Sequence, residues 1–185
     1  MSQAADASTA VDAHVLLQRW AEGDRESGAR LYRLYFPMIY RFFRTKVSEG
    51  VEDLVQSTFA AGLEARDRFR GDSKFSTFLY GVARNQLLSH FRKVDKHRAA
   101  ALEVSVADFG TSPSGHLARD EAQRRLYDAL CGLPIDHQIA IELHYWEGLS
   151  SREIAEIVGE PEPTVRTRIR RARIKLRAVL APNEA

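Results

Sequence analysis

The chain has 185 residues, 44% hydrophobic and 28% charged, which is enough for one or two small domains with ordinary apolar cores. Its single cysteine, Cys131, excludes an intramolecular disulfide framework. No apolar run approaches the roughly 20 residues of a membrane span, and the N-terminus lacks a signal-peptide pattern. We therefore expect a soluble, cytoplasmic protein that does not contact a membrane.

Helical periodicity is common along the chain and strand signals are scarce, which predicts an all-α fold. In the first half, helices are predicted over 12–22, from about Asp24 onward, over Val51–Ala65 and from Phe75 to about Arg92. Pro37 leaves open whether the second helix bends or restarts. The last helix has a regular apolar stripe of Phe75, Leu79, Val82, Ala83 and Leu87.

A segment without Lys or Arg interrupts this pattern from Ala99 to Ala118 and contains Gly110, Pro113 and Gly115. A structureless stretch of this length is unusual inside one compact domain. We therefore predict two small helical domains joined by a flexible linker. The predicted parts are a disordered N-terminus (1–11), a first domain (12–98), the linker (99–117) and a second domain (118–181).

The second half predicts a helix-turn-helix after helices over Leu117–Leu130 and Ile135–Trp146. Ser150 and Glu153 have the spacing of a capping box, Gly159 can end the short helix, and Pro163 can open the next. That next helix has an apolar stripe of Val165, Ile169, Ala172, Leu176 and Val179. Seven of the twelve residues from Arg166 to Arg177 are basic and none is acidic. A basic face suits DNA phosphates, although a helical hairpin with a basic surface would show the same charges.

In the first domain, aromatic and basic residues alternate between Phe69 and Lys93. Aromatic rings can stack on exposed bases while cations follow the phosphates, so the mixture suits single-stranded DNA. From the residues alone, however, aromatics at helical spacing favour a core, and Phe75 is expected to be part of it.

In this order and spacing, these blocks resemble the extracytoplasmic-function class of bacterial sigma factors. The resemblance covers roughly 12–98 and 118–180. It rests on EDLVQSTF (Glu52–Phe59), FRGDSKFSTFLYGVARN (Phe69–Asn85), the Leu133-Pro134 pair, and GLSSREIAEIVG (148–159) followed by PTVRTRIRRAR (163–173). Ser57 stands where the family usually has glutamate, and Phe78 where it usually has tryptophan.

The resemblance implies a transcription initiation factor that binds core RNA polymerase, directs it to promoters and assists melting. The helix over Val51–Ala65 would bind the clamp helices of the largest subunit through Asp53 and Gln56. An anti-sigma factor is expected as a further partner. The residues expected at the −35 element are Arg166, Thr167, Arg170, Arg171 and Arg173. Those expected at the −10 element are Arg70, Gly71, Asp72, Ser73, Lys74, Phe78, Tyr80, Arg84 and Asn85.

Two other functions were weighed. A stand-alone helix-turn-helix regulator would usually need a dimer to span two half-sites, and its first half would bind a ligand or accept a phosphate. An enzyme is disfavoured, because the six histidines lack metal-ligand spacing and no Walker A, dinucleotide or nucleophile-elbow motif is present. We therefore expect no catalytic residues, no metal and no cofactor.

Overall fold

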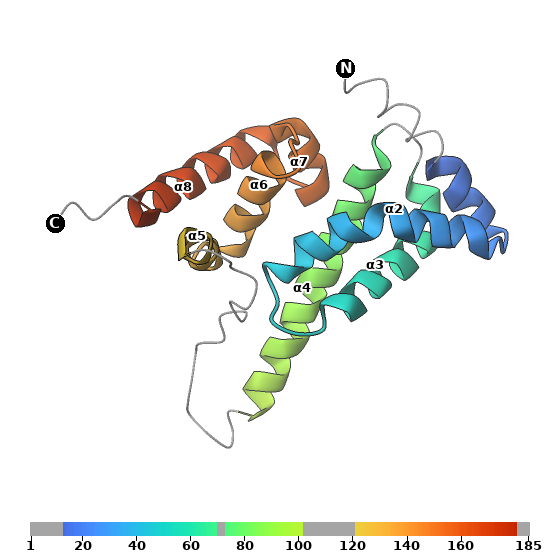
Figure 1. Ribbon diagram of the computed structural model, residues 1–185, viewed down its shortest axis with the longest axis horizontal. Helices are drawn as coiled ribbons and strands as arrows, with labels where there is room; N and C mark the ends of the chain where they lie inside the picture. Colours follow the sequence, from blue (N-terminus) through green and yellow to red (C-terminus); the bar gives the residue numbers. More distant parts are fainter. Residues whose placement is uncertain (1–12, 70–72, 102–120, 181–185) are drawn as a thin grey trace. The chain divides into compact units, whose positions relative to one another are not determined.

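The computed structural model describes residues 13–69, 73–101 and 121–180, and every regular element within these ranges is a helix (Figure 1). Contacts divide the chain into two compact units. Unit 1 runs to Phe43 and resumes at Gly50, whereas unit 2 combines Arg44–Glu49 with the C-terminal helices. The prediction of an all-α protein with two helical domains is confirmed.

Unit 1 contains a helix over 13–21, α2 (Arg25–Arg44), α3 (Val51–Glu64), the short η1 (Arg66–Arg68) and α4 (Phe75–Ala101). Asp24 stabilises the start of α2, since its Oδ1 accepts hydrogen bonds from the backbone N–H of Glu26 at 3.0 Å and of Ser27 at 3.3 Å. The hydroxyl of Ser27 also donates to Asp24 Oδ2 at 2.7 Å. These hydrogen bonds from Ser27 hold the pKa of Asp24 below its usual range.

Two helix boundaries differ from simple sequence expectations. α2 continues through Pro37, so this proline neither ends the helix nor starts a new one. α4 continues to Ala101, well beyond the predicted end near Arg92 and three residues into the segment predicted as a linker. The added residues are mostly Ala, Lys and Arg, which have high helix propensity.

The core of unit 1 is rich in aromatic rings. Tyr32 of α2 contacts Phe59 of α3 with ring centroids 4.8 Å apart, and Tyr35 contacts Phe75 of α4 at 4.9 Å. On α4 the predicted stripe faces inward: Phe75, Leu79, Ala83 and Leu87 are buried, and Val82 is half-buried. Phe75 is therefore a core residue, as expected.

Unit 2 contains α5 (Glu121–Cys131), α6 (Ile135–Tyr145), α7 (Ser151–Val158) and α8 (Glu162–Leu180). α8 packs against the other three helices. Its buried face follows the predicted stripe at Val165 and Ala172, both 0% exposed. The last residue of that stripe was predicted wrongly, because Val179 is 57% exposed: it lies in the final turn of α8.

Unit 2 also contains a buried polar cluster. Lys46 forms an ion pair with Glu142 of α6, and the hydroxyl of Thr45 donates to the same Glu142 oxygen at 3.0 Å. The Gln138 amide donates to the other Glu142 oxygen and to the Thr45 carbonyl, both at 2.9 Å. Burial lowers the pKa of Lys46, and the negative charge of Glu142 opposes this effect.

We predict opposite effects for alanine at two buried helical glycines. A Cβ at Gly28 would lie 2.6 Å from two atoms of the Trp20 indole ring, whereas a Cβ at Gly62 meets nothing closer than Leu79 Cδ1 at 3.4 Å. Gly28→Ala should therefore lower the free energy of unfolding by about 1–3 kcal/mol through overpacking. Gly62→Ala should raise it by up to about 1 kcal/mol through helix propensity. Urea unfolding measures both, and a similar loss in the two variants would contradict this packing.

Candidate nucleic-acid interface

Helices α7 and α8 form the predicted helix-turn-helix. The capping box is present: Ser150 Oγ accepts the backbone N–H of Glu153 at 3.2 Å, and Glu153 Oε2 accepts the backbone N–H of Ser150 at 2.8 Å. Gly159 ends α7 in the left-handed region, with φ of 66°, where a side chain would be strained. Only Gly159–Pro161 separates the two helices, so their relative direction is set within three residues.

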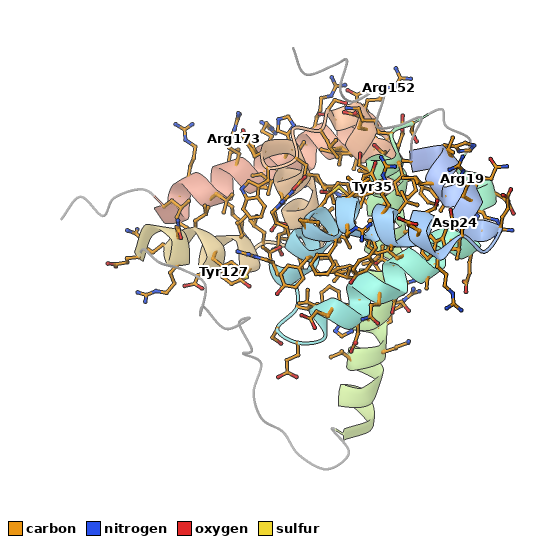
Figure 2. The ribbon with its side chains drawn as sticks, turned by 45° about the vertical axis from the view of Figure 1, so that its right-hand side comes forward. Arg19, Asp24, Tyr35, Tyr127, Arg152 and Arg173 are labelled. Atoms are coloured by element: carbon orange, nitrogen blue, oxygen red, sulfur yellow. The ribbon has the colours of Figure 1, made fainter. Side chains whose placement is uncertain are left out.

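Most basic side chains of α8 point to solvent. Arg166, Arg170, Arg171 and Arg173 are exposed, and Figure 2 shows Arg173 projecting from the helix. Thr167 is half-buried, and its hydroxyl donates to the carbonyl of Pro163 at 2.9 Å. The five residues predicted to contact the −35 element therefore lie on one helix, and none of them belongs to the buried core.

Arg168 differs from these neighbours although the basic run makes it look similar. Its side chain is only 18% exposed and contacts Glu160 and Asp136. The charge pattern alone did not separate Arg168 from the exposed arginines, because Asp136 lies on another helix. The one local sign of this ion pair in the sequence was Glu160, an acidic residue in the turn before Pro163.

The start of α6 is in a positive electrostatic environment near α8. Burial, followed by the charges of Arg168 and Arg171, lowers the pKa of His137. Asp136 opposes this shift to a smaller extent. Since burial is the larger cause, this shift shows mainly that His137 is shielded from water, with cationic groups of α8 nearby.

The described residues predicted at the −10 element differ in exposure. Lys74 and Asn85 are exposed, whereas Ser73, Phe78 and Arg84 are half-buried. Arg70, Gly71 and Asp72 lie outside the described residues. Tyr80 is 1% exposed, with its ring centroid 5.7 Å from that of Phe42, so it is a core residue and not a surface available to DNA. This burial corrects the expected position of Tyr80, because its ring packs against Phe42 of α2.

The two residues predicted to bind polymerase are accessible. Asp53 and Gln56 are exposed on α3, on the side opposite the buried Leu54, Val55 and Phe59. The helix is thus amphipathic, and its polar side is available to a protein partner.

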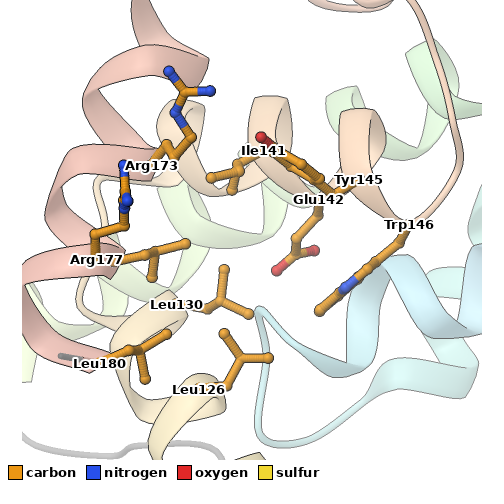
Figure 3. A pocket seen from close by; sticks show the side chains of 10 residues that line it. Leu126, Leu130, Ile141, Glu142, Tyr145, Trp146, Arg173, Arg177 and Leu180 are labelled. Carbon is orange, nitrogen blue, oxygen red and sulfur yellow. The ribbon is translucent and has the colours of Figure 1, made fainter. Parts of the chain in front are cut away.

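Sequence reasoning missed a groove in unit 2 with a volume of about 670 Å³ (Figure 3). Three helices contribute to it: leucines of α5 and α8 form much of the apolar lining, α6 adds Tyr145, and α8 adds Arg173 and Arg177. Trp146, the residue after α6, also lines the groove. Tyr145 and Trp146 are also exposed. Adjacent aromatics at the end of α6 were the only local signal, because the groove exists only once the three helices have packed.

Comparison with known proteins decides the family. Residues 31–97 match Sigma-70 region 2, and residues 123–176 match Sigma-70, region 4. The ECF RNA polymerase sigma-E factor of Haemophilus influenzae is 32% identical over 178 residues, which cover 90% of this chain and 94% of that protein. The sigma-E factor of Escherichia coli K12 is 33% identical over 170 residues, 86% of this chain and 89% of that protein.

This chain belongs to the ECF sigma factors of the sigma-70 family. Two solved structures resemble the sigma factor. RpoE, solved with the anti-sigma factor NepR from Bartonella quintana, has a TM-score of 0.68 and 26% identity, and the match covers 84% of this chain and 98% of that one. CnrH, solved with the cytosolic domain of CnrY, has a TM-score of 0.67 and 26% identity, with coverage of 94% and 99%.

The family assignment confirms the resemblance inferred from the sequence motifs. The sigma factor is a transcription initiation factor, and the alternative of a stand-alone regulator is set aside because both sigma regions are matched. Over the described ranges, no helix combines the length and apolar character that crossing a bilayer requires.

We predict that the capping box stabilises the helix-turn-helix of the sigma factor. Ser150→Ala removes the acceptor for the N–H of Glu153 and should cost about 1 kcal/mol of unfolding free energy. Ser150→Thr keeps a hydroxyl in the same role and serves as the control. Denaturant unfolding followed by Trp146 fluorescence, with Trp20→Phe in the background, measures the change in unit 2. Equal stability of the alanine and threonine variants would contradict the prediction.

Proposed function

We propose that the sigma factor reads −35 DNA with α8, helps to open −10 DNA with α4 and its preceding loop, and binds core RNA polymerase through α3. The observation that carries the proposal is the division of α8 into a buried apolar face and an exposed face with five arginines. The proposed role is non-catalytic and takes place in the cytoplasm.

For −35 recognition, the first turns of α8 enter the major groove of DNA. Arg166, Arg170 and Arg171 are exposed there and can donate two hydrogen bonds to a guanine edge. Thr167 can contact a base with its methyl group while its hydroxyl stays bonded to Pro163. Arg173 lies further along the helix and suits a phosphate.

For −10 recognition, Asn85 and Lys74 are the exposed members among those residues of the set that the structure describes. The amide of Asn85 carries donors and an acceptor, so it can pair with the edge of an unstacked base, and Lys74 can bind a phosphate. Phe78 is half-buried and contacts Phe69 with ring centroids 5.3 Å apart. Because the ring is not fully buried, part of it is accessible to a base. Arg70, Gly71, Asp72, Ser73 and Arg84 complete the proposed surface, and Tyr80 is left out of it.

For the polymerase, Asp53 and Gln56 on the polar side of α3 are proposed to contact the clamp helices of the largest subunit. A carboxylate and an amide on an exposed helix suit the basic and polar residues of a partner helix. An anti-sigma factor is a further proposed partner. Its support is RpoE, which is 26% identical to this sigma factor and was solved in complex with the anti-sigma factor NepR.

We predict that Arg170→Ala with Arg171→Ala weakens −35 recognition and leaves folding intact. Both side chains are exposed and off the buried stripe, so the thermal midpoint should change little. With core polymerase, discrimination between a selected and a scrambled −35 element should fall by about 1–3 kcal/mol per residue if each reads a base. A uniform loss across all sequences would instead identify phosphate contacts.

The matched control is Arg124→Ala with Arg125→Ala, two exposed arginines of α5. It removes the same charge from unit 2 and should preserve −35 discrimination. If the control loses as much −35 discrimination, the effect comes from net charge. A large loss of stability in the α8 variant would contradict the exposure of these arginines.

We predict that Asn85→Ala impairs promoter opening and spares polymerase binding. The exposed amide is lost without disturbing the core, so assembly with core polymerase should keep its affinity. Fewer open complexes should form, because holding a flipped base must offset a few kcal/mol of unstacking. Permanganate reactivity of unpaired thymines measures opening. Gln123→Ala removes an exposed amide from α5 and is the control; normal opening by Asn85→Ala would refute this role.

A further inference from the structure

The helix-turn-helix contains one arginine that is oriented inward. We propose that Arg168 is a positioning residue, which fixes the orientation of α8 and thereby sets −35 discrimination without contacting DNA itself. The inference rests on the proposed function and concerns its specificity.

The contacts of Arg168 connect three elements of unit 2. Its Nη2 lies 2.9 Å from Glu160 Oε1 in the turn between α7 and α8, and 3.9 Å from Asp136 Oδ2 in the first turn of α6. One planar guanidinium therefore joins α8 to the turn before it and to a helix outside the helix-turn-helix. A rotation or tilt of α8 would break at least one of these contacts.

The burial of this group distinguishes it from the other ion pairs of the motif. The Arg168 side chain is 18% exposed, and those of Glu160 and Asp136 are 32% and 37% exposed. By contrast, Arg166 is 63% exposed and lies 3.7 Å from Glu162 within the same helix, where it cannot fix one element against another. Charge-assisted hydrogen bonds that are partly shielded from water are stronger and more selective in geometry than exposed pairs.

A contact between Arg168 and a phosphate does not fit this geometry. Its Nη1 is buried, so this side of the guanidinium faces the interior of unit 2 and not solvent. Reaching a phosphate would require breaking the 2.9 Å contact with Glu160.

The position of Arg168 on α8 explains why it affects recognition. Thr167 precedes it, and Arg171 follows one turn later, so any change in the direction of α8 displaces the proposed reading residues together. The buried Val165 and Ala172 hold α8 in the fold from either side of this position. Loss of Arg168 should therefore loosen the orientation of α8 while leaving the helix folded.

Neutralising the acidic partners distinguishes a general electrostatic effect on DNA affinity from an effect on sequence preference. Glu160 and Asp136 carry negative charge close to a DNA-binding helix, so simple electrostatics predicts that their neutralisation strengthens binding to any DNA. If they act by holding Arg168, neutralisation must instead weaken the preference for the correct −35 sequence. Glu160→Gln keeps the shape of the side chain and removes only the charge.

The experiment uses the full chain assembled with core RNA polymerase and a randomised promoter library, with bound promoters sequenced. Arg168→Ala and Glu160→Gln should each reduce the preference for the selected −35 sequence by about tenfold, the size of one base-edge contact, and leave the −10 preference unchanged. The double variant should be no worse than Arg168→Ala, because both changes remove one interaction. Arg124→Ala, on α5, should change neither preference.

Several results would overturn the inference. An unchanged −35 preference in Arg168→Ala would show a role in stability alone. An equal loss of affinity for all sequences would show a phosphate contact, if the slope of log affinity against log salt concentration also fell by about one. If Arg168→Ala does not fold, Glu160→Gln decides, and an unchanged preference there rejects the inference. Absence of any −35 preference in the wild-type protein would instead reject the proposed function.

Discussion

The two-sided character of α8 is the constraint on which unit 2 depends. Val165 and Ala172 are fully buried and hold α5, α6 and α7 around the helix, while Arg170 and Arg171 face solvent. A helix repeats every 3.6 residues, so a one-residue shift would expose the core and bury the arginines. The same few turns thus form both the centre of the fold and the proposed DNA surface.

In unit 1, aromatic residues of α4 are likewise committed to the core. Phe75 and Tyr80 are buried on α4, whereas Asn85 is exposed and Phe78 lies between these extremes. A core made of rings leaves few aromatics for stacking on bases. The proposed −10 surface accordingly combines polar groups with one half-buried ring, that of Phe78.

Burial also determines what each charge does. Exposed ion pairs such as Arg166 with Glu162 contribute little, because water screens both partners. Arg168 is partly shielded from water and contacts two carboxylates on other elements, and we propose that these contacts fix the direction of α8. Lys46 is fully buried, and its ion pair with Glu142 and the surrounding hydrogen bonds offset only part of the lost hydration.

The sequence by itself determined the features that depend on neighbouring residues: the helical stripes, the capping box of Ser150 and Glu153, the glycine that ends α7, and the family motifs. Helix ends were less predictable, as the continuation of α4 to Ala101 shows, because propensity alone can extend a helix beyond its buried face. Only the tertiary structure decided that Tyr80 is buried, that Arg168 differs from the arginines beside it, and that three helices enclose a groove. Each of these depends on residues distant in the chain, and local periodicity carries no information about which distant residues come into contact.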